Sequence, residues 1–206
     1  MKSHVIEIST PFKFENNSPN FLTIKKNFFL VSYLMAQTIN PSDFDVVNKL
    51  TPAGHTGQTS VVTEKSDSKK YTLKQLSDTL RDKNQFLKIL TLDHPAIGKF
   101  RGYKDDRKPI VVTEFYNNGS INDAIADITS KKWSDARKYQ VILGMACGIE
   151  HIHNQGVFHA NIKPTNVMLD DNFQPKLCDF GVTDNIADQK TAFTAPELFS
   201  SPNNIH

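Results

Sequence analysis

A change in hydrophobic pattern near residue 116 is the feature that most constrains the fold. Before it, turn-forming residues separate short runs rich in β-branched and aromatic residues, a pattern typical of strands: "FDVVNKL", "SVVTEK", "KKYTLKQL", "HPAIGKFRGY" and "PIVVTEFY". One helical stretch is expected among them, from Asp78 to Leu92. After it, apolar residues recur at helical spacing from Ser134 to His153, with Ser134 as the expected N-cap. Short strands are then expected at "VFHA", "VML" and "KLC", so the pattern predicts an α+β protein.

The composition of the 206 residues is that of an ordinary folded protein and disfavours some kinds of partner. The chain is 38% hydrophobic and 22% charged. Its net charge is only +2, and charges of both signs are interspersed, so attraction to nucleic acid or to an anionic membrane is weak. The apolar run "FFLVSYLMA" at 28–36 has about half the length that a membrane-spanning helix needs. We therefore expect no nucleic-acid partner and no membrane partner.

Cys147 and Cys178 are the only cysteines, and they lack the close spacing of a metal or redox motif. Both lie in apolar stretches, so we expect two reduced thiols packed in the interior. Reduced thiols favour an intracellular protein, and the expected location is cytoplasmic.

Five short motifs follow one another along the chain: "YTLK" at 71–74, "VVTEFYNNGSI" at 111–121, "HANIKPTN" at 159–166, "DFG" at 179–181 and "APE" at 195–197. Taken alone, Lys74 is explained as a solvated strand lysine, Asn166 as a turn former and Asp179 as a helix cap. Together, and in this order, the motifs resemble those of the protein kinase family from Asn48 to Glu197.

The resemblance implies a protein-kinase-like two-lobe fold. Residues 43–116 correspond to the N-lobe, an antiparallel sheet plus one helix, and residues 117–206 to a partial helical C-lobe that ends just after "APE". Residues 1–42 form an N-terminal extension of unknown role. Because a full kinase continues through further helices, we expect a C-terminally truncated domain in which the apolar face of the helix at 134–153 is partly uncovered.

The resemblance also implies two cofactors, ATP and Mg²⁺. Lys74 is similar to the lysine on the ATP phosphates, Asn166 and Asp179 to the two Mg²⁺ ligands, and Lys163 to the lysine that stabilises charge on the transferred phosphoryl group. That lysine in "IKPTN" resembles the loop of Ser/Thr-directed kinases. The other expected nucleotide-binding residues belong to the glycine-rich loop, the N-lobe helix, and the gatekeeper and hinge: Gly54, Gly57, Gln85, Thr113 (the gatekeeper), Glu114 and Tyr116.

Several positions depart from the family pattern. Asn161 stands where the family has its catalytic Asp, and loss of a general base typically costs roughly 10²- to 10⁴-fold in rate. Gln85 stands where the N-lobe helix carries a Glu that pairs with the lysine. Pro52 replaces the first glycine of the phosphate-covering loop, and Ala160 replaces an arginine that reads a phosphorylated activation loop.

Three functions remain open from the sequence. The first is a catalytically impaired pseudokinase, either ATP-binding or unable to bind nucleotide, that acts as a signalling or interaction module. The second is an active ATP-dependent Ser/Thr protein kinase, which the retained Lys74, Asn166 and Asp179 permit. The third is a truncated product without a cellular role. No residue pattern identifies a protein substrate or a protein partner.

Overall fold

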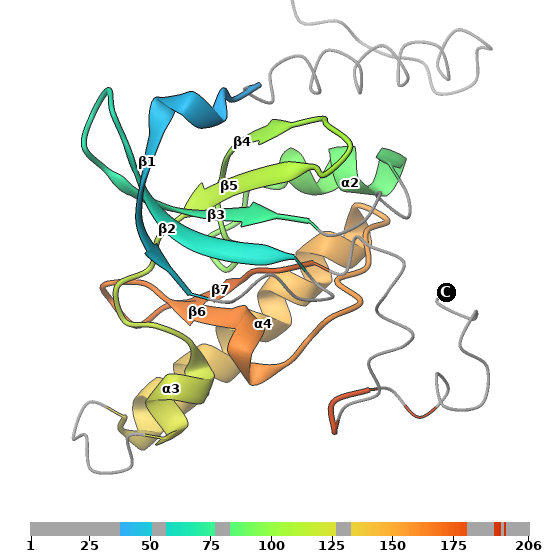
Figure 1. Ribbon diagram of the computed structural model, residues 1–206. Coiled ribbons are helices and arrows are strands. Elements are labelled where there is room, and N and C mark those ends of the chain that lie inside the picture. The colour runs from blue at the N-terminus through green and yellow to red at the C-terminus, as the bar shows by residue number, and fades with distance from the viewer. Residues whose placement is uncertain are drawn as a thin grey trace, which may run out of the picture.

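The computed structural model describes residues 38–50, 57–76, 83–126, 133–180, 192–194 and 196. Its upper lobe is a five-stranded antiparallel sheet in the order β1-β2-β3-β5-β4 with helix α2 packed beside it, and its lower part holds α3, α4 and a two-stranded sheet (Figure 1). The elements of the upper lobe are the 3-10 helix η1 (Pro41–Asp43), β1 (Phe44–Lys49), β2 (Gln58–Glu64), β3 (Lys70–Gln75), α2 (Lys83–Leu90), β4 (Phe100–Lys104) and β5 (Ile110–Glu114). The elements of the lower part are α3 (Ile121–Ala126), α4 (Asp135–Asn154), the 3-10 helix η2 (Pro164–Asn166), β6 (Val167–Leu169) and β7 (Pro175–Leu177).

The five predicted strand runs of the upper lobe are confirmed as β1 to β5. Val62, Tyr71 and Val112 from three neighbouring strands form one buried cluster with Phe44. Ile39 is buried in the same cluster, so residues 38–42, which we assigned to the extension, pack on this lobe. The division of the chain into an extension and two lobes otherwise stays a prediction.

Within the described residues, helix α2 spans Lys83–Leu90 and ends before the predicted Leu92. The predicted start at Asp78 falls among residues 77–82, which lie outside the described residues. Its apolar positions are buried as their spacing predicted, with Phe86 and Ile89 each 1% exposed. Phe86 packs on Tyr103 of β4 at a ring-centroid distance of 4.8 Å, which holds the helix against the sheet.

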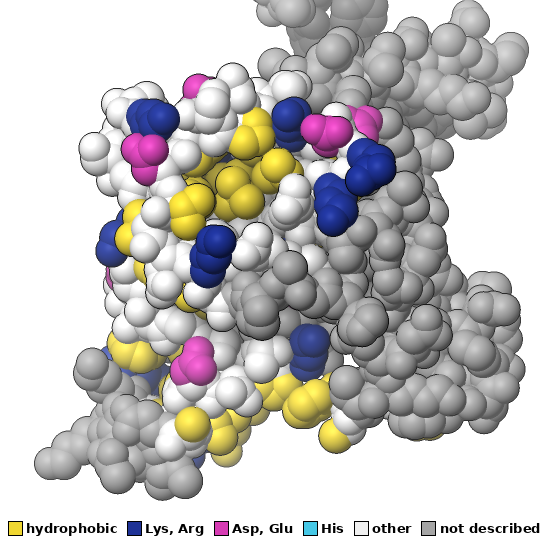
Figure 2. Space-filling view, viewed as in Figure 1, with side chains coloured by type: hydrophobic (Ala, Val, Ile, Leu, Met, Phe, Trp, Pro, Cys, Tyr) yellow, Lys and Arg dark blue, Asp and Glu magenta, His cyan; other side chains and the backbone are white. Residues whose placement is uncertain are grey.

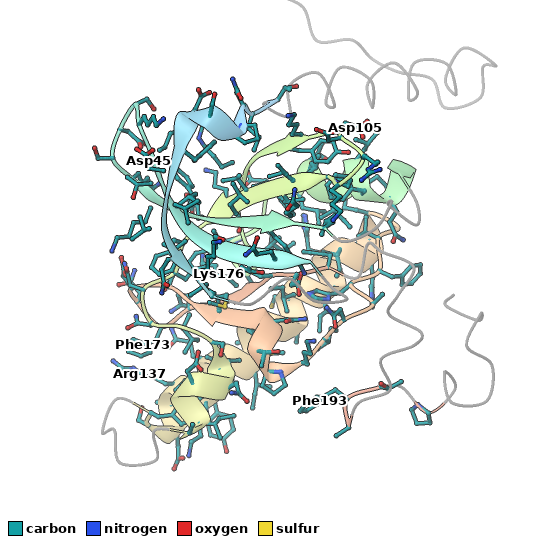
Figure 3. The ribbon with its side chains drawn as sticks, in the orientation of Figure 1. Asp45, Asp105, Arg137, Phe173, Lys176 and Phe193 are labelled. Atoms are coloured by element: carbon teal, nitrogen blue, oxygen red, sulfur yellow. The ribbon has the colours of Figure 1, made fainter. Side chains whose placement is uncertain are left out.

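The long helix of the lower part is confirmed together with its N-cap. Ser134 Oγ accepts a hydrogen bond from the Arg137 amide at 3.4 Å, and the guanidinium of Arg137 lies 4.4 Å from the ring centroid of Phe173 in the β6–β7 turn (Figure 3). Helix α3 was not predicted. Its signal was Ser120, whose amide and hydroxyl both donate to Asp123 Oδ2 three residues later, as in a capping box.

The strand predicted at "VFHA" is wrong, because residues 157–160 form no strand. Ala160 has a φ of 56°, and the Asn161 amide donates to His159 Nδ1 at 3.3 Å. This local hydrogen bond turns the chain out of the extended conformation. The strands predicted at "VML" and "KLC" are confirmed as β6 and β7, which pair antiparallel.

One buried cluster joins the two lobes. Ile89 from α2 and Ile97 from the loop before β4 pack against Ile152 of α4, Val157 and Phe180. Beside it, the Gly98 amide donates to Leu177 O and the Leu177 amide donates to Ala96 O, both at 2.8 Å. These contacts set the position of the sheet above α4, and therefore the shape of the space between the lobes.

Part of the apolar surface of α4 is exposed, as predicted. Tyr139 is 74% exposed, Ile142 64% and Leu143 66%, and they follow one another at helical spacing. Figure 2 shows hydrophobic side chains along the lower edge of the described part, and interspersed positive and negative side chains above them. Among the described residues, no helix has the length and apolar character needed to cross a membrane.

Both cysteine thiols are free, but the prediction that both are packed is wrong for one of them. Cys178, after β7, is partly buried beside the cavity, and desolvation raises the pKa of its thiol to about 12. Cys147 is exposed on α4, because Val141, Gly148 and Ile152 share the buried face of the helix and Cys147 lies about a third of a turn away from it.

Candidate functional site

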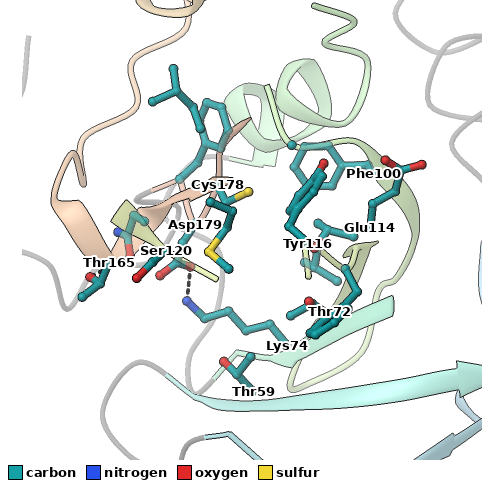
Figure 4. A pocket seen from close by; sticks show the side chains of 18 of the residues that line it. Thr59, Thr72, Lys74, Phe100, Glu114, Tyr116, Ser120, Thr165, Cys178 and Asp179 are labelled. Carbon is teal, nitrogen blue, oxygen red and sulfur yellow. Dashed lines mark hydrogen bonds and ion pairs between the residues drawn. The ribbon is translucent and has the colours of Figure 1, made fainter. Parts of the chain in front are cut away.

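A cavity of about 560 Å³ lies between the sheet of the upper lobe and the β6–β7 side of the lower part (Figure 4). This volume is in the range of sites that hold small molecules such as nucleotides. Seven of the residues singled out from the sequence line it: Lys74, Thr113, Glu114, Tyr116, Lys163, Asn166 and Asp179. They come from β3, β5, the segment after β5, the loop before η2, η2 itself and the segment after β7.

Lys74 reaches across the cavity to the carboxylate of Asp179 (Figure 4). Side chains alternate along β3, so Thr72, Lys74 and Leu76 share the face that lines the cavity. The side chains of the ion pair are 21% and 30% exposed. The pair is therefore partly shielded from water but open to an incoming ligand.

The loop from Asn161 to Asn166 is closed by one internal hydrogen bond and tied to the segment just after β7 by two more. Asn166 is only 5% exposed, and its Nδ2 donates to Asn161 O at 2.8 Å. Its own carbonyl accepts from the Cys178 amide at 2.9 Å. Asn161 Nδ2 in turn donates to the main-chain oxygen of Asp179 at 3.0 Å. The two proposed metal ligands, Asn166 and Asp179, are thus held on one frame.

His159 anchors this frame in the interior. Its ring is 2% exposed and stacks on Phe180 with the ring centroids 4.4 Å apart. Burial lowers the pKa of His159 to about 4, so the imidazole is neutral near pH 7 and serves as a packing and hydrogen-bonding group. Phe180 packs against Ile89 of α2, which connects the residue after Asp179 to the upper lobe.

The segment after β5 is held firmly at the back of the cavity. The Tyr116 hydroxyl accepts a hydrogen bond from the Lys99 amide at 3.1 Å, and burial of the ring raises the pKa of the phenol. The Glu114 amide donates to Lys99 O at 3.0 Å. Thr113, the expected gatekeeper, precedes them on β5 and lines the cavity from the sheet side.

Three expected site residues do not line the cavity. Gln85 lies on α2 outside its lining, and the carboxylate that Lys74 engages is Asp179. Asn161 sits behind Asp179, bonded to its carbonyl. Gly57 has a φ of 98°, and a Cβ there would lie 2.0 Å from Gln75 O. The close approach of β2 to β3 therefore explains this glycine without a role in nucleotide binding. The predictions for Gly54 and Pro52 fall outside the described residues.

Sequence reasoning missed much of the apolar lining. Thr72 and Leu76 could have been inferred from their alternation with Lys74 on one strand. Phe100, Met168 and Leu177 reach the cavity only through the packing of distant segments, for which the sequence carries no local signal.

The residues present suit a magnesium-bound nucleotide. Asn166 and Asp179 supply side-chain oxygens on the lower wall of the cavity, and Lys74 supplies a positive charge on the upper wall. Within the described ranges, no group of three or more His, Cys, Asp or Glu is arranged to hold a metal. Two protein oxygens fit Mg²⁺, because this ion is usually bound by one or two protein groups together with water and phosphate oxygens.

Comparison with known proteins agrees with this geometry. A sequence model of the protein kinase domain matches residues 46–206. The chain is 36% identical over 120 residues to cysteine-rich receptor-like protein kinase 24 of Arabidopsis thaliana, covering 55% of this chain and 19% of the relative. It is 33% identical over 120 residues to a receptor-like serine/threonine-protein kinase of the same plant, covering 55% and 18%. It is 34% identical over 105 residues to a G-type lectin S-receptor-like serine/threonine-protein kinase of Oryza sativa subsp. indica, covering 45% and 13%.

These curated relatives are therefore several times longer than the part that matches, and the chain spans less than a fifth of each of them. The match to the kinase domain nevertheless covers both lobes, from β1 to the last residue of the chain. The five-stranded antiparallel sheet, the single helix beside it and the partial helical lower lobe are those expected from the motifs. The chain belongs to the protein kinase family.

Proposed function

We propose that this chain is a nucleotide-binding kinase domain that holds ATP with Mg²⁺ but transfers phosphate poorly, and that it acts as a signalling or interaction module. One observation carries the proposal. At the position of the catalytic carboxylate, Asn161 has an amide that donates to Asp179 O, beside a cavity in which Lys74 and Asp179 are paired. The side chains that would bind Mg-ATP line this cavity, whereas the expected proton acceptor is replaced by a side chain that donates.

Each retained group has a physical role toward the nucleotide. The positive charge of Lys74 faces the cavity and would neutralise phosphate oxygens, while Asn166 and Asp179 would hold the metal ion. When bound, Mg²⁺ would neutralise charge on the phosphates. Lys163 lines the same cavity and would stabilise charge on the terminal phosphoryl group.

The missing step is proton removal from a substrate hydroxyl. A carboxamide is not a base, so Asn161 gives no general-base assistance, and the expected loss is roughly 10²- to 10⁴-fold in rate. Gln85 weakens the site further, because a neutral amide cannot form an ion pair with Lys74. Poor transfer with retained binding follows from these two substitutions.

An active Ser/Thr protein kinase is the second candidate. Lys163, Asn166 and Asp179 together line the cavity, and phosphoryl transfer depends mostly on positioning and charge stabilisation. Two of the relatives described above are named serine/threonine-protein kinases. This alternative requires a measurable transfer rate without a base at position 161.

One sample can separate the two functions. The thermal unfolding midpoint is measured with and without Mg-ATP, and transfer of the γ-phosphate of labelled ATP to protein is then followed on the same preparation. The proposal predicts a rise in the midpoint, since a ligand that binds only the folded state stabilises it, and negligible transfer. The Lys74→Met variant serves as the control.

Two outcomes would contradict the proposal in different ways. Robust phosphate transfer that disappears in Lys74→Met would establish the active kinase instead. A midpoint that does not respond to Mg-ATP at millimolar concentrations would remove the nucleotide site itself.

A further inference from the structure

We propose that Asn161 is a positioning residue, in which a side-chain amide holds the backbone of Asp179 so that its carboxylate faces Lys74. At the position where the family has its catalytic Asp, Asn161 would no longer accept a proton from a substrate. It would instead donate a structural hydrogen bond, which a carboxylate cannot do. The nucleotide part of this inference rests on the proposed function, whereas the hydrogen bond and its effect on the loop do not.

Asn161 is held from three of its own atoms. Its Nδ2 donates to Asp179 O at 3.0 Å, its main-chain amide donates to His159 Nδ1 at 3.3 Å, and its carbonyl accepts from Asn166 Nδ2 at 2.8 Å. The first of these bonds joins residues that are 18 positions apart in the sequence. Asn161 therefore links the loop that carries Asn166 to the chain that carries Asp179.

The backbone on both sides of this link is in an unfavourable conformation. Asp179 has a φ of 57° and Ala160 a φ of 56°. This left-handed region is uncommon for residues other than glycine, although Asp enters it more readily than Ala, and surrounding contacts stabilise it. The Asn161 amide provides such a contact at the carbonyl of Asp179 itself. Losing it should allow Asp179 to relax, and its carboxylate would then move away from Lys74 and from the metal position.

Replacing Asn161 by Asp should weaken the contact with the Asp179 carbonyl oxygen. An ionised carboxylate has no hydrogen to donate, so Asn161→Asp would place one of its oxygens against the Asp179 carbonyl oxygen, as if replacing Nδ2 at 3.0 Å. The substitution would remove an attraction and introduce a repulsion at the same point. Restoring the family's residue should therefore loosen the site and should not restore phosphate transfer.

The first test needs no ligand. Amide hydrogen exchange is measured on peptides that cover residues 167–180 in the parent chain, Asn161→Asp, Asn161→Ala and the matched control Asn172→Asp. Asn172 is exposed in the β6–β7 turn, so its substitution introduces the same charge change away from the site. The Cys178 amide, which donates to Asn166 O, should exchange about tenfold faster or more in Asn161→Asp.

Asn161→Ala removes the donor without adding a charge, and it should give a smaller increase in the same direction. It also keeps the test decisive if Asn161→Asp does not fold. Unchanged exchange at Cys178 in the folded Asn161 variants, or equal increases in Asn172→Asp, would overturn the proposed role.

The second test separates positioning from general stability. The dissociation constant for ATP is measured with Mg²⁺ and with excess chelator. Because Asp179 acts through the metal, Asn161→Asp should lose about tenfold of the Mg²⁺-dependent affinity and leave the metal-free affinity nearly unchanged. A uniform loss in both conditions, or a gain of phosphate transfer, would contradict the inference. If the parent binds no ATP, the proposed function fails, and the exchange experiment alone decides the role of Asn161.

Discussion

Replacement of Lys74 by methionine should weaken ATP binding strongly while leaving the fold nearly intact. Methionine keeps the length of the aliphatic stem and removes the charge. The Lys74 side chain is 21% exposed, so its ammonium group interacts with a phosphate in a partly dehydrated setting. A hydrogen bond to a charged group contributes about 1.5–3 kcal/mol, which corresponds to roughly a 10- to 150-fold increase in the dissociation constant.

The free energy of unfolding should change little in the same variant. Asp179 loses its partner, but its side chain is 30% exposed and can be hydrated. The expected loss of stability is less than about 1 kcal/mol, as for partly exposed ion pairs. This difference between binding and stability distinguishes a ligand-binding lysine from a structural one.

The assay is a titration with a fluorescent ATP analogue in the presence of Mg²⁺, combined with urea unfolding of each variant. Lys65→Met is the matched control, because Lys65 lies in the turn before the same strand, is 54% exposed and pairs at 3.5 Å with Asp45, which does not line the cavity. Its dissociation constant should stay within about twofold of the parent value. The reasoning is refuted if Lys74→Met also binds within about twofold of the parent, or if both lysine variants lose affinity equally.

Three further results are expected. In Gly98→Ala, the new Cβ would lie 2.4 Å from Cys178 Sγ, so the unfolding free energy measured in urea should fall by about 1–3 kcal/mol. Adding Cys178→Ala to this variant should relieve part of the loss. If Gly98→Ala costs the same free energy with Cys178 as with Ala at position 178, the packing is contradicted. The pKa of His159 is lowered to about 4 in the folded chain, so between about pH 6.5 and 4 only the unfolded chain binds a proton at this residue. The thermal midpoint of the parent should therefore fall as the pH falls through this range. In His159→Gln the midpoint should fall less steeply. Parallel pH profiles of the two proteins would argue against a buried neutral imidazole. Finally, iodoacetamide at pH 8 should label the exposed Cys147 quickly and Cys178 slowly until the protein unfolds, because the thiol pKa of Cys178 is raised to about 12. Mass spectrometry of the labelled peptides measures both rates. Equally rapid labelling of the two cysteines in the native protein would contradict the raised pKa of Cys178.

The strands of the upper lobe and helix α4 could be predicted because their side-chain periodicity is local. Helix α3 was missed because it has only six residues, too few for a periodic pattern, although the spacing of Ser120 and Asp123 was available as a capping signal. The failed strand at 157–160 has a different cause. Its apolar residues fit a strand, but Ala160 adopts a left-handed backbone, and the Asn161 amide bonds locally to the His159 side chain, which a strand pattern does not reveal.

The site was predictable to the extent that its residues lie in motifs. Lys74, Asn166 and Asp179 stand in the expected order, and the fold brings them to one cavity. The partner of Lys74 was not predicted. From the sequence alone we considered only a residue of the N-lobe helix as its partner, whereas in the structure Lys74 pairs with Asp179. The bond from Asn161 Nδ2 to Asp179 O was also out of reach, because it joins distant residues and depends on an uncommon φ at Asp179.

The most direct test of the account is calorimetric titration of the chain with ATP, performed once with Mg²⁺ and once with excess chelator. The cavity between the lobes pairs Lys74 with Asp179 and places Asn166 beside them, so binding should be saturable, with one site per chain and higher affinity when Mg²⁺ is present. Binding that is absent in both conditions, or that is indifferent to the metal ion, would contradict the claim that this cleft is a magnesium-nucleotide site.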